Sequence, residues 1–276
     1  MTALASNNFH SNPLKAQLML GFLLLFNSCT SFENQYVISG NTMGTTYLVK
    51  IVAPDNANDL GSIERSIDSL LIQLNKQMST WDPKSEISQY NDWNSKVPFA
   101  VSDDFLNVVR KSITISEQTG GLFDPTVYDL MSLWGFGPNP RSGFPDMEDV
   151  HRVLEHTGIG QIEIIDSVLV KSNKKCKLDL NAIAKGYGVD KIFNFLNEKG
   201  FNNIFVEIGG EVKCSGKNRE SKDWSIGIEN PSGDANYQKK IMEEITILGA
   251  SPNGWQVEVL SQASFTAKLM TLVITS

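Results

Sequence analysis

The chain has few of the residues that build metal clusters and covalent cross-links. Its 276 residues include three cysteines and three histidines. These residues do not have the spacing of zinc ligands, so a zinc site is not expected. Positive charge is also scarce: 24 Lys and Arg face 31 Asp and Glu, which gives a net charge of −7 at pH 7. Because a phosphate backbone binds to a basic face, this composition excludes nucleic acid as the main partner.

The cysteines and histidines give no sign of covalent or nucleophilic chemistry. Cys176 and Cys214 could pair in an oxidising compartment, but their spacing alone does not imply a disulfide. The favoured interpretation is two unpaired thiols that pack as small hydrophobic groups in or near strands. His151 and His156 fall on one surface-type helix near no recognisable nucleophile, so both are expected to be solvated. Ser-His-Asp catalysis is therefore not supported.

The N-terminus carries a targeting pattern. Residues 16–26 form an apolar run that is too short to span a bilayer comfortably and is typical of the core of a signal peptide. The run ends in Asn27-Ser28-Cys29, which resembles the cleavage site of bacterial lipoproteins. We therefore expect a signal peptide over 1–28, a lipid on Cys29 and a tether over 29–35. The alternative is an uncleaved membrane anchor.

Hydrophobic periodicity predicts both helices and strands. The helical pattern predicts helices over 59–78, 102–119, 146–158 and 182–199. A shorter helix is expected to open with Asp124 as N-cap and Pro125 as its first residue. Alternation and turn signals predict strands over 162–165, 168–171, 177–180, 203–208, 212–215 and 224–228.

Two further segments complete this prediction. Residues 36–52 read as two short strands joined at Ser39-Gly40-Asn41, or as one bulged strand. Residues 79–98 read as a long polar connection, and connections of this length are uncommon unless they bind something. The hairpins and the mixed order of elements favour an α+β fold with antiparallel sheets over a doubly wound parallel sheet.

The stretch 179–190 has the strongest functional signal. Asp179 ends a short apolar segment, and a helix then opens with a backbone carbonyl, Lys185 and Gly186 close together. Helix N-termini attract anions, and carboxylate or carbonyl oxygens attract magnesium, so such a corner can hold a phosphate and a metal ion together. Polar groups near a buried strand end need partners. The stretch therefore favours a binding site over a purely structural role.

Four other motifs each have a structural alternative. Met43 and Gly44 could lie against a flat ring or form a strand bulge with a core methionine. Trp81 could stack on a heterocycle or cover the rim of the core. Asp124 could simply cap a helix, or the backbone before it could run along a ligand. The pair Gly209-Gly210 could turn amides toward an anion or make a tight hairpin.

Taken in order, these motifs closely resemble the ApbE family, the FAD:protein FMN transferases. The matching segments are 40–45, 78–88, 121–126, 179–187 and 207–211, and the resemblance covers about residues 36–231. It implies a T-fold-like α+β single domain over 36–237. It also implies that a Thr or Ser hydroxyl of an acceptor protein attacks the FMN phosphorus of FAD, and that AMP leaves.

The resemblance also implies partners and site residues. FAD is the substrate, Mg²⁺ assists, and the acceptor is a subunit of a membrane redox pump. The chain is then expected on the periplasmic side of a bacterial membrane, with the inner membrane favoured. Ala182 is expected to give its backbone carbonyl to Mg²⁺. The residues expected to line or contact FAD are Met43, Trp81, Leu122, Phe123, Asp124, Asp179 and Lys185.

The resemblance stops near the C-terminus. The family continues with a His-x-Ile-Asp-Pro-type motif and an Asp…Thr pair that supplies further magnesium ligands, and neither follows Pro231. Residues 238–276 contain no His and no Asp, and they are predicted to be a divergent tail. One hypothesis is a frameshifted or truncated remnant. The other is a genuine tail on a flavin-binding lipoprotein with little transferase activity, and FAD hydrolysis to FMN and AMP is a third possible function.

Overall fold

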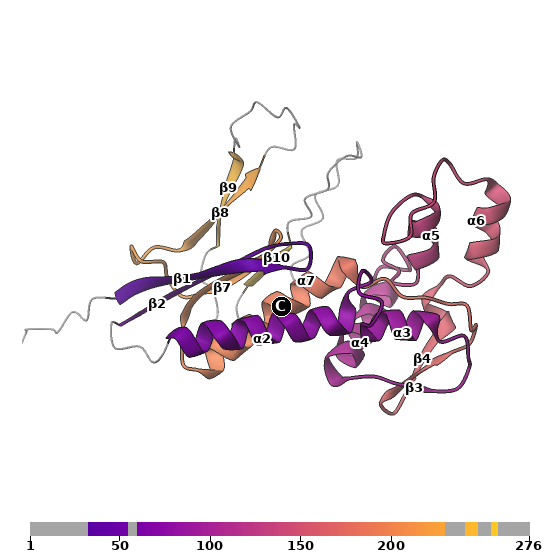
Figure 1. Ribbon diagram of the computed structural model, residues 1–276. Helices are drawn as coiled ribbons and strands as arrows, with labels where there is room; N and C mark the ends of the chain where they lie inside the picture. The colour runs from indigo at the N-terminus through magenta and orange to yellow at the C-terminus, as the bar shows by residue number, and fades with distance from the viewer. Residues whose placement is uncertain (1–32, 55–59, 230–240, 248–254, 259–276) are drawn as a thin grey trace, which may run out of the picture.

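An antiparallel sheet of five strands forms one part of this protein. The computed structural model describes residues 33–54, 60–229, 241–247 and 255–258 (Figure 1). The strand order is β1-β2-β6-β7-β10, and each neighbouring pair is antiparallel. The strands are β1 (Glu33–Thr42), β2 (Thr45–Pro54), β6 (Asn203–Ile208), β7 (Glu211–Ser215) and β10 (Trp255–Glu258). With the helices below, this confirms the α+β class.

Two long helices, α2 (Leu60–Met78) and α7 (Asn181–Glu198), pack against one face of this sheet. Alternate residues of the central strands point toward the helices, because successive side chains of a strand face opposite sides. Each helix contributes apolar residues spaced three or four positions apart, which lie along one side of the helix. This first core includes Val49, Ile51, Ile67, Leu71, Val189, Ile192, Val206 and Ile208.

A second core lies at the other end of the two helices. It is enclosed by α3 (Glu86–Asp92), α4 (Asp103–Gln118) and a small antiparallel sheet of order β3-β5-β4. Those strands are Phe99–Ala100, Val168–Lys171 and Ile162–Ile165. The buried residues include Leu74, Met78, Ile87, Phe105, Val109, Leu178, Leu180 and Ala184.

Helices α2 and α7 are shared by the two cores. Helix α2 contributes Ile67 to the first core and Met78 to the second. Helix α7 contributes Ala184 to the second core and Val189 to the first. The N-terminal half of α7 therefore lies where the two packed regions meet.

The remaining elements lie outside these cores. Helices α5 (Tyr128–Leu133) and α6 (Met147–Leu154) form a lobe beyond α4, followed by a short 3₁₀ turn, Ile159–Gln161. Strands β8 (Trp224–Glu229) and β9 (Ile241–Ile247) form a separate two-stranded sheet. Within the described ranges, no helix is both long and apolar enough for a membrane span. The predicted signal peptide and Cys29 lie outside those ranges.

The first hairpin turns at a different place from the one predicted. Strand β1 runs from Glu33 to Thr42, so it takes in the last three residues of the predicted tether. The turn is not at Ser39-Gly40-Asn41 but at Met43-Gly44, where φ is 50° and 72°. Gly40 sits inside the ladder opposite Tyr47, and a Cβ on it would be 2.7 Å from the Tyr47 ring. This glycine therefore makes room for a ring and does not mark a turn.

The polar connection 79–98 contains a helix that the pattern did not predict. Helix α3 is short and starts after Ser85, whose hydroxyl accepts a hydrogen bond from the Ser88 backbone at 3.1 Å. Such a cap satisfies one free backbone N–H of the first turn. The signal was present as Ser85 followed by Glu86, but only Ile87 and Tyr90 are its large buried apolar residues, too few to show a helical period.

The predicted strand over 177–180 is wrong. The segment is extended, but a side chain takes the place of a neighbouring strand. The amide of Asn91 donates to the Leu178 carbonyl at 2.8 Å, and its oxygen accepts from the Leu178 N–H at 2.7 Å. Both backbone groups of this buried residue are thus paired without a ladder, as buried backbone groups require.

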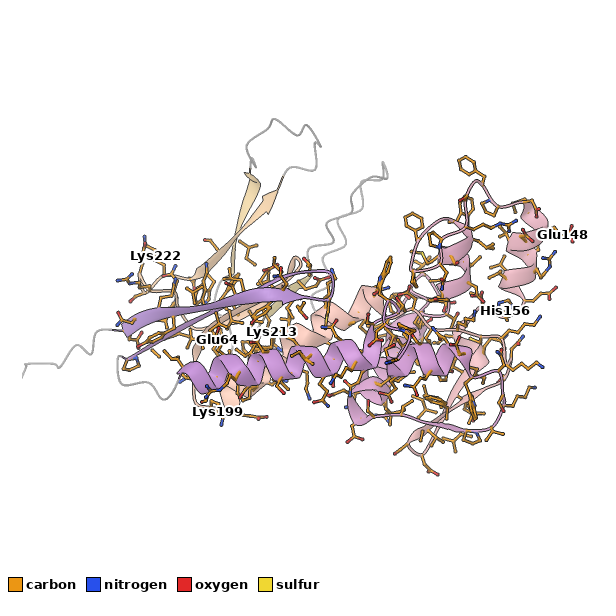
Figure 2. The ribbon with its side chains drawn as sticks, in the orientation of Figure 1. Glu64, Glu148, His156, Lys199, Lys213 and Lys222 are labelled. Atoms are coloured by element: carbon orange, nitrogen blue, oxygen red, sulfur yellow. The ribbon has the colours of Figure 1, made fainter. Side chains whose placement is uncertain are left out.

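The cysteine prediction is confirmed, and one histidine prediction is wrong. Cys176 and Cys214 are both free and buried. His151 is exposed as expected. His156, however, has a side chain only 12% exposed, and its Nε2 lies 3.1 Å from Asp129 Oδ2. Figure 2 places His156 near α5 and α6, where it helps to join these two helices.

Lys171 is a buried cation on β5. Lys171 is 1% exposed. Its ammonium donates to the Tyr90 carbonyl at 2.8 Å and lies 4.4 Å from the centre of the Tyr90 ring. Burial lowers the pKa of Lys171 from 10.5 to about 8, because the charged form loses its hydration. The contact ties α3 to the small sheet through an ammonium that loses its proton more readily than one in water.

This burial predicts a pH dependence of stability. Between pH 8 and 10.5 the unfolded chain holds a proton on Lys171 that the folded chain has released, so Lys171 makes the free energy of unfolding rise with pH. The variant Lys171→Met should lose this contribution, as measured by denaturant unfolding at several pH values in that window. The comparison with wild type is needed because the buried thiols of Cys176 and Cys214, whose pKa values are raised, act in the opposite direction. Identical pH profiles for the two proteins would contradict the expectation.

Candidate functional site

The N-terminal half of α7 gathers all the motif segments. Segment 179–187 contacts three of the other motif segments directly. Gly188, one residue further along, approaches the fourth through Met43. The Asp179 backbone donates to the Pro125 carbonyl at 2.7 Å. The Asn181 amide lies 3.4 Å from the Thr80 hydroxyl. Lys185 pairs with Glu211. Motifs that are far apart in the sequence therefore form one site.

The turn Met43-Gly44 reaches this site through a glycine of α7. Gly188 is buried, and a Cβ built on it would lie 3.1 Å from Ile208 Cδ1 and 3.4 Å from Met43 Cε. A larger residue would push against both neighbours. Met43 is partly buried and packs against the second core. This packing confirms the core methionine, although Met43 stands in the hairpin turn and not in a strand bulge. The contact of Met43 with a flat ring stays a prediction.

Lys185 forms the charged centre of the site. Its ammonium lies 2.7 Å from Glu211 Oε1 and 3.5 Å from the Gly209 carbonyl. The Lys185 side chain is 30% exposed, whereas that of Glu211 is 7% exposed. The carboxylate is thus at the protein side of the pair, and the ammonium is at the solvent side, where an anion can reach it.

The turn Gly209-Gly210 is a tight hairpin between β6 and β7. Both glycines have positive φ, 55° and 100°, which side chains rarely adopt. The Gly210 N–H donates to Glu207 Oε1 at 2.7 Å, and the Gly209 N–H donates to the Thr46 carbonyl at 3.1 Å. The structural interpretation of these glycines is confirmed, and the same turn supplies the carbonyl beside Lys185.

Asp179 lies in a desolvated position just before α7. Its Oδ1 accepts from the Asn181 N–H at 2.8 Å. Burial raises the pKa of Asp179, while the bonds from Asn181 act in the opposite direction. The helix N-cap is Leu180, so Asp179 is not the cap itself. A half-buried carboxylate next to a helix N-terminus is suited to a cation bound together with an anion.

Asp124 does not cap a helix, contrary to the prediction. Helix α5 begins at Tyr128, and its N-cap is Val127. The Asp124 carboxylate instead accepts from the Thr126 N–H at 2.8 Å, which closes a local turn. The Thr126 hydroxyl accepts from the Gly158 N–H at 2.6 Å and so fixes this turn to the segment after α6. The turn holds the Pro125 carbonyl against Asp179.

Two of the residues expected to contact FAD, Trp81 and Leu122, are exposed, and so is Ala182, the residue expected to bind Mg²⁺. Trp81 is 66% exposed, which argues against its role as a cover for the core. Leu122 is 93% exposed, and Phe123 is partly buried. Ala182 is exposed in the first turn of α7, where backbone N–H groups lack helical partners and favour anions. Large apolar surfaces at a site edge are suited to a flat ring.

The site offers some of the oxygen ligands that a magnesium ion needs, but not a complete set. Asp179 supplies a carboxylate and Thr80 a hydroxyl close to Ala182, and such hard oxygen ligands are those that Mg²⁺ prefers. Over the described ranges, no group of three or more His, Cys, Asp or Glu could hold a metal ion by itself. Mg²⁺ often binds one or two carboxylates together with substrate phosphates, so these residues fit the ion when a nucleotide is present.

Some site residues were not predicted from the sequence. Gly188, Thr80 and Asn181 contact other motif segments, yet none was singled out. Glu211 stood inside the matching segment 207–211, but its pairing with Lys185 depends on the hairpin and the helix being side by side. Such contacts cannot be found from spacing along the chain.

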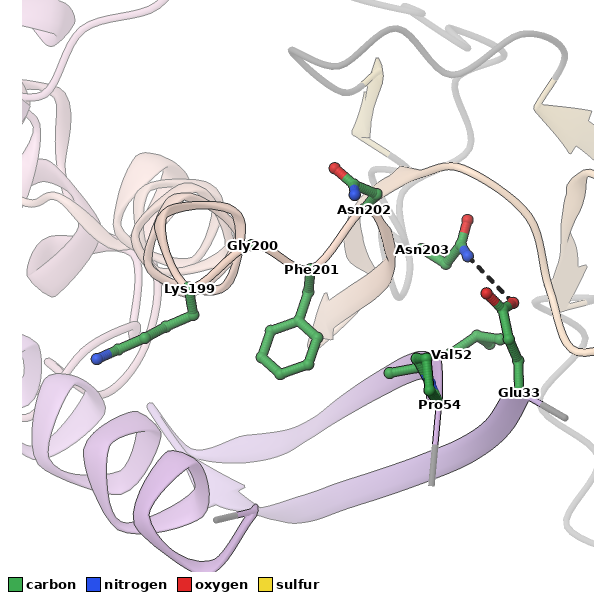
Figure 3. A pocket seen from close by; sticks show the side chains of 9 residues that line it. Glu33, Val52, Pro54, Lys199, Gly200, Phe201, Asn202 and Asn203 are labelled. Atoms are coloured by element: carbon green, nitrogen blue, oxygen red, sulfur yellow. Dashed lines mark hydrogen bonds between the residues drawn. The ribbon is translucent and has the colours of Figure 1, made fainter. Parts of the chain in front are cut away.

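A hollow elsewhere on the protein is not part of this site. It has a volume of about 190 Å³ and is lined by the outer ends of β1 and β2 and by residues 199–203 (Figure 3). Phe201 and the Glu33–Asn203 hydrogen bond of 3.5 Å lie along it. It sits at the C-terminal end of α7, and the candidate site sits at the N-terminal end, about 27 Å away along an 18-residue helix.

The fold and the site together define a flavin-nucleotide transferase. The chain belongs to the ApbE family, whose model matches residues 43–261. The family match thus extends about 30 residues beyond the end of the resemblance seen in the motifs.

Named relatives and solved structures agree with this family. The FAD:protein FMN transferase of Vibrio cholerae is 40% identical over 225 residues, which are 81% of this chain and 67% of that protein. The one from Haemophilus influenzae is 33% identical over 237 residues, covering 82% and 68%. The flavin transferase ApbE structure from Vibrio cholerae superposes with a TM-score of 0.73 at 38% identity and covers 82% and 71%. The apo ApbE structure from Pseudomonas stutzeri gives 0.68 at 31% identity and covers 71% and 66%.

The Gly209 turn allows a direct test of the site's packing. A Cβ on Gly209 would lie 2.7 Å from Thr45 Cγ2 and 3.3 Å from Lys185 Cδ, at a φ of 55°. Gly209→Ala should therefore destabilise the fold by roughly 1–3 kcal/mol and weaken FAD binding. Gly200→Ala is the matched control, because Gly200 has a φ of 89° but no atom within 4 Å of its Cβ position. Denaturant unfolding measures the stability of each variant, and flavin fluorescence titration measures its FAD affinity. Equal FAD affinity of the two variants would contradict the assigned packing.

Proposed function

We propose that this flavin transferase moves FMN from FAD to a Thr or Ser hydroxyl of an acceptor protein and releases AMP. The observation that carries the proposal is the convergence of four motif segments on the fifth, which includes the first turns of α7. In the reaction, the hydroxyl oxygen forms a bond to the FMN phosphorus while the bond from that phosphorus to the AMP oxygen breaks. The electron pair stays with AMP, and the hydroxyl proton is released.

The charged residues are placed to bind the pyrophosphate. Lys185 presents an ammonium at the solvent side of its ion pair, and the first turn of α7 presents free N–H groups. Both stabilise negative charge on phosphate oxygens. Asp179 and the Ala182 carbonyl would hold Mg²⁺ with those oxygens, and the ion when bound would offset the charge that builds up on them.

The apolar residues are placed to bind flat rings. Trp81 and Leu122 expose most of their surface, and Met43 packs beside Gly188 of α7. Stacking of a heterocycle on Trp81 would remove apolar area from water, and such burial stabilises a complex. Phe123 and Asp124 lie next to Leu122 on the turn that is bonded to Asp179 through Pro125.

The cellular setting belongs to the same proposal. The leader pattern over 1–28 and Cys29 support a lipoprotein that is held on the periplasmic side of a bacterial membrane, with the inner membrane favoured. The acceptor would be a subunit of a membrane redox pump that reaches the same compartment. A lipid anchor would hold the enzyme and such an acceptor at one surface, which raises the effective concentration of each for the other.

Transfer activity is the main expected outcome. Wild-type protein with FAD and Mg²⁺ should add the mass of one FMN, less one water, to an acceptor domain, as measured by mass spectrometry, and should release AMP. Asp179→Asn should lower this rate about 10-fold or more, since the amide keeps the shape but loses the charge that binds a cation. Asp166→Asn, in the exposed β4–β5 turn with φ of 55°, is the control. Free FMN without acceptor labelling would indicate a hydrolase instead, and FAD binding without turnover a flavin-binding protein.

Lipidation of Cys29 has its own test. Expressed in a bacterium with the full leader, the wild-type chain should fractionate with membranes and lose residues 1–28, as detected by mass spectrometry of the N-terminal peptide. Cys29→Ser should keep the leader and carry no lipid, because lipoprotein processing acts on a cysteine. Membrane fractionation of Cys29→Ser with a processed N-terminus would refute the lipid anchor, and an unprocessed wild-type chain would indicate an uncleaved anchor.

A further inference from the structure

Glu211 is a buried carboxylate with only one of its two oxygens in contact with a donor. Its side chain is 7% exposed, and Oε1 lies 2.7 Å from the Lys185 ammonium. Its other oxygen, Oε2, is buried and has no hydrogen-bond partner in the described part of the chain. Burying a charge with incomplete pairing costs stability. The β6–β7 turn does not need this carboxylate, because Glu207 already closes the turn through the Gly210 N–H.

The pair determines where the Lys185 ammonium can lie. A lysine has a flexible four-carbon stem, and in solution its ammonium samples many positions. Here Glu211 Oε1 and the Gly209 carbonyl, 3.5 Å away, both accept from it. An ammonium has three N–H donors, so one stays available for a third acceptor. The two contacts fix the ammonium and leave it able to bind one more oxygen.

The stem of Lys185 is also confined. A Cβ on Gly209 would lie 3.3 Å from Lys185 Cδ and 2.7 Å from Thr45 Cγ2. The stem therefore passes close to the hairpin turn and to the strand that follows Met43-Gly44. Glu211 holds the end of a side chain whose middle is already enclosed by two of the motif segments.

We propose that Glu211 is a positioning residue: it holds the Lys185 ammonium where one oxygen of the FAD pyrophosphate receives its free N–H during transfer. The inference rests on the proposed function. Negative charge grows on the AMP oxygen as the phosphorus–oxygen bond breaks, and a donor that is already in place stabilises this charge without reorganisation. Glu211 neutralises the lysine in the resting site. Loss of Glu211 is therefore expected to lower kcat more than it changes KM for FAD.

The test is a double-mutant cycle on transfer kinetics. Glu211→Gln keeps the shape and an accepting oxygen but removes the charge that fixes Lys185, so kcat should fall at least 10-fold while KM for FAD changes less than 3-fold. Lys185→Met should be at least as slow. The double variant Lys185→Met/Glu211→Gln should be no slower than Lys185→Met alone, because Glu211 acts through Lys185. If the two losses multiply, the inference fails.

A second variant separates positioning from packing. Glu211→Asp keeps the charge but is one methylene shorter, so positioning requires a kcat above that of Glu211→Gln, whereas a packing role requires the reverse order. This ranking stays readable if Lys185→Met, which leaves a buried charge unpaired, does not fold. The control is Glu220→Gln, which breaks an exposed pair of 2.8 Å with Lys222, at the end of the sheet away from α5 and α6 (Figure 2).

The outcomes distinguish this inference from the function on which it rests. A wild-type protein that binds FAD and transfers no FMN overturns the proposed function and the positioning role together. A wild-type protein that transfers FMN, with multiplying losses or with Glu211→Asp slower than Glu211→Gln, overturns the positioning role alone. Transfer by the wild type together with a non-additive cycle supports both.

Discussion

The shared packing of α7 is the constraint on which the site depends. One half of this helix is buried in the core under the five-stranded sheet and the other half in the core under α3 and α4. Each core alone would hold the helix at one end only. Because both hold it, the first turns of α7 stay at a fixed distance from the β6–β7 turn and from the segments around Thr80 and Pro125. Rigid placement of this kind is what a phosphate-transfer site needs, since small displacements of the reacting groups cost much of the rate.

The residues of α7 explain how one helix can serve so many neighbours. Small residues, Ala184 and Gly188 among them, occur where other segments approach, and the bulky Ile192 and Leu196 follow further on. Gly188 costs helix stability in isolation, but it admits Met43 and Ile208 at distances that a side chain would occupy. The cost in local helix propensity is offset by the burial of the helix in the two cores.

Most of the fold could be predicted from the sequence, because most elements carry a periodic pattern of their own. Helices α2 and α7 and the hairpin of β4 and β5 agree with their patterns almost to the residue. The errors share a physical cause: the residue that decides the outcome lies elsewhere in the chain. Tyr47 decides that Gly40 belongs to a strand, and Asn91 replaces the strand neighbour of Leu178. Likewise, the motifs indicated which segments form the site, but the pairing of Lys185 with Glu211 required their arrangement in space.

The short strand β10 has a consequence for how the protein behaves in solution. It pairs with β7 along Glu211–Cys214, and so it covers one side of the strand that carries Glu211. Without it, β7 would become the edge of the sheet and would present unpaired backbone N–H and C=O groups to any other extended chain. The four residues of β10 thus place the described edge of the sheet one strand away from β7, the strand that carries the charged centre of the site.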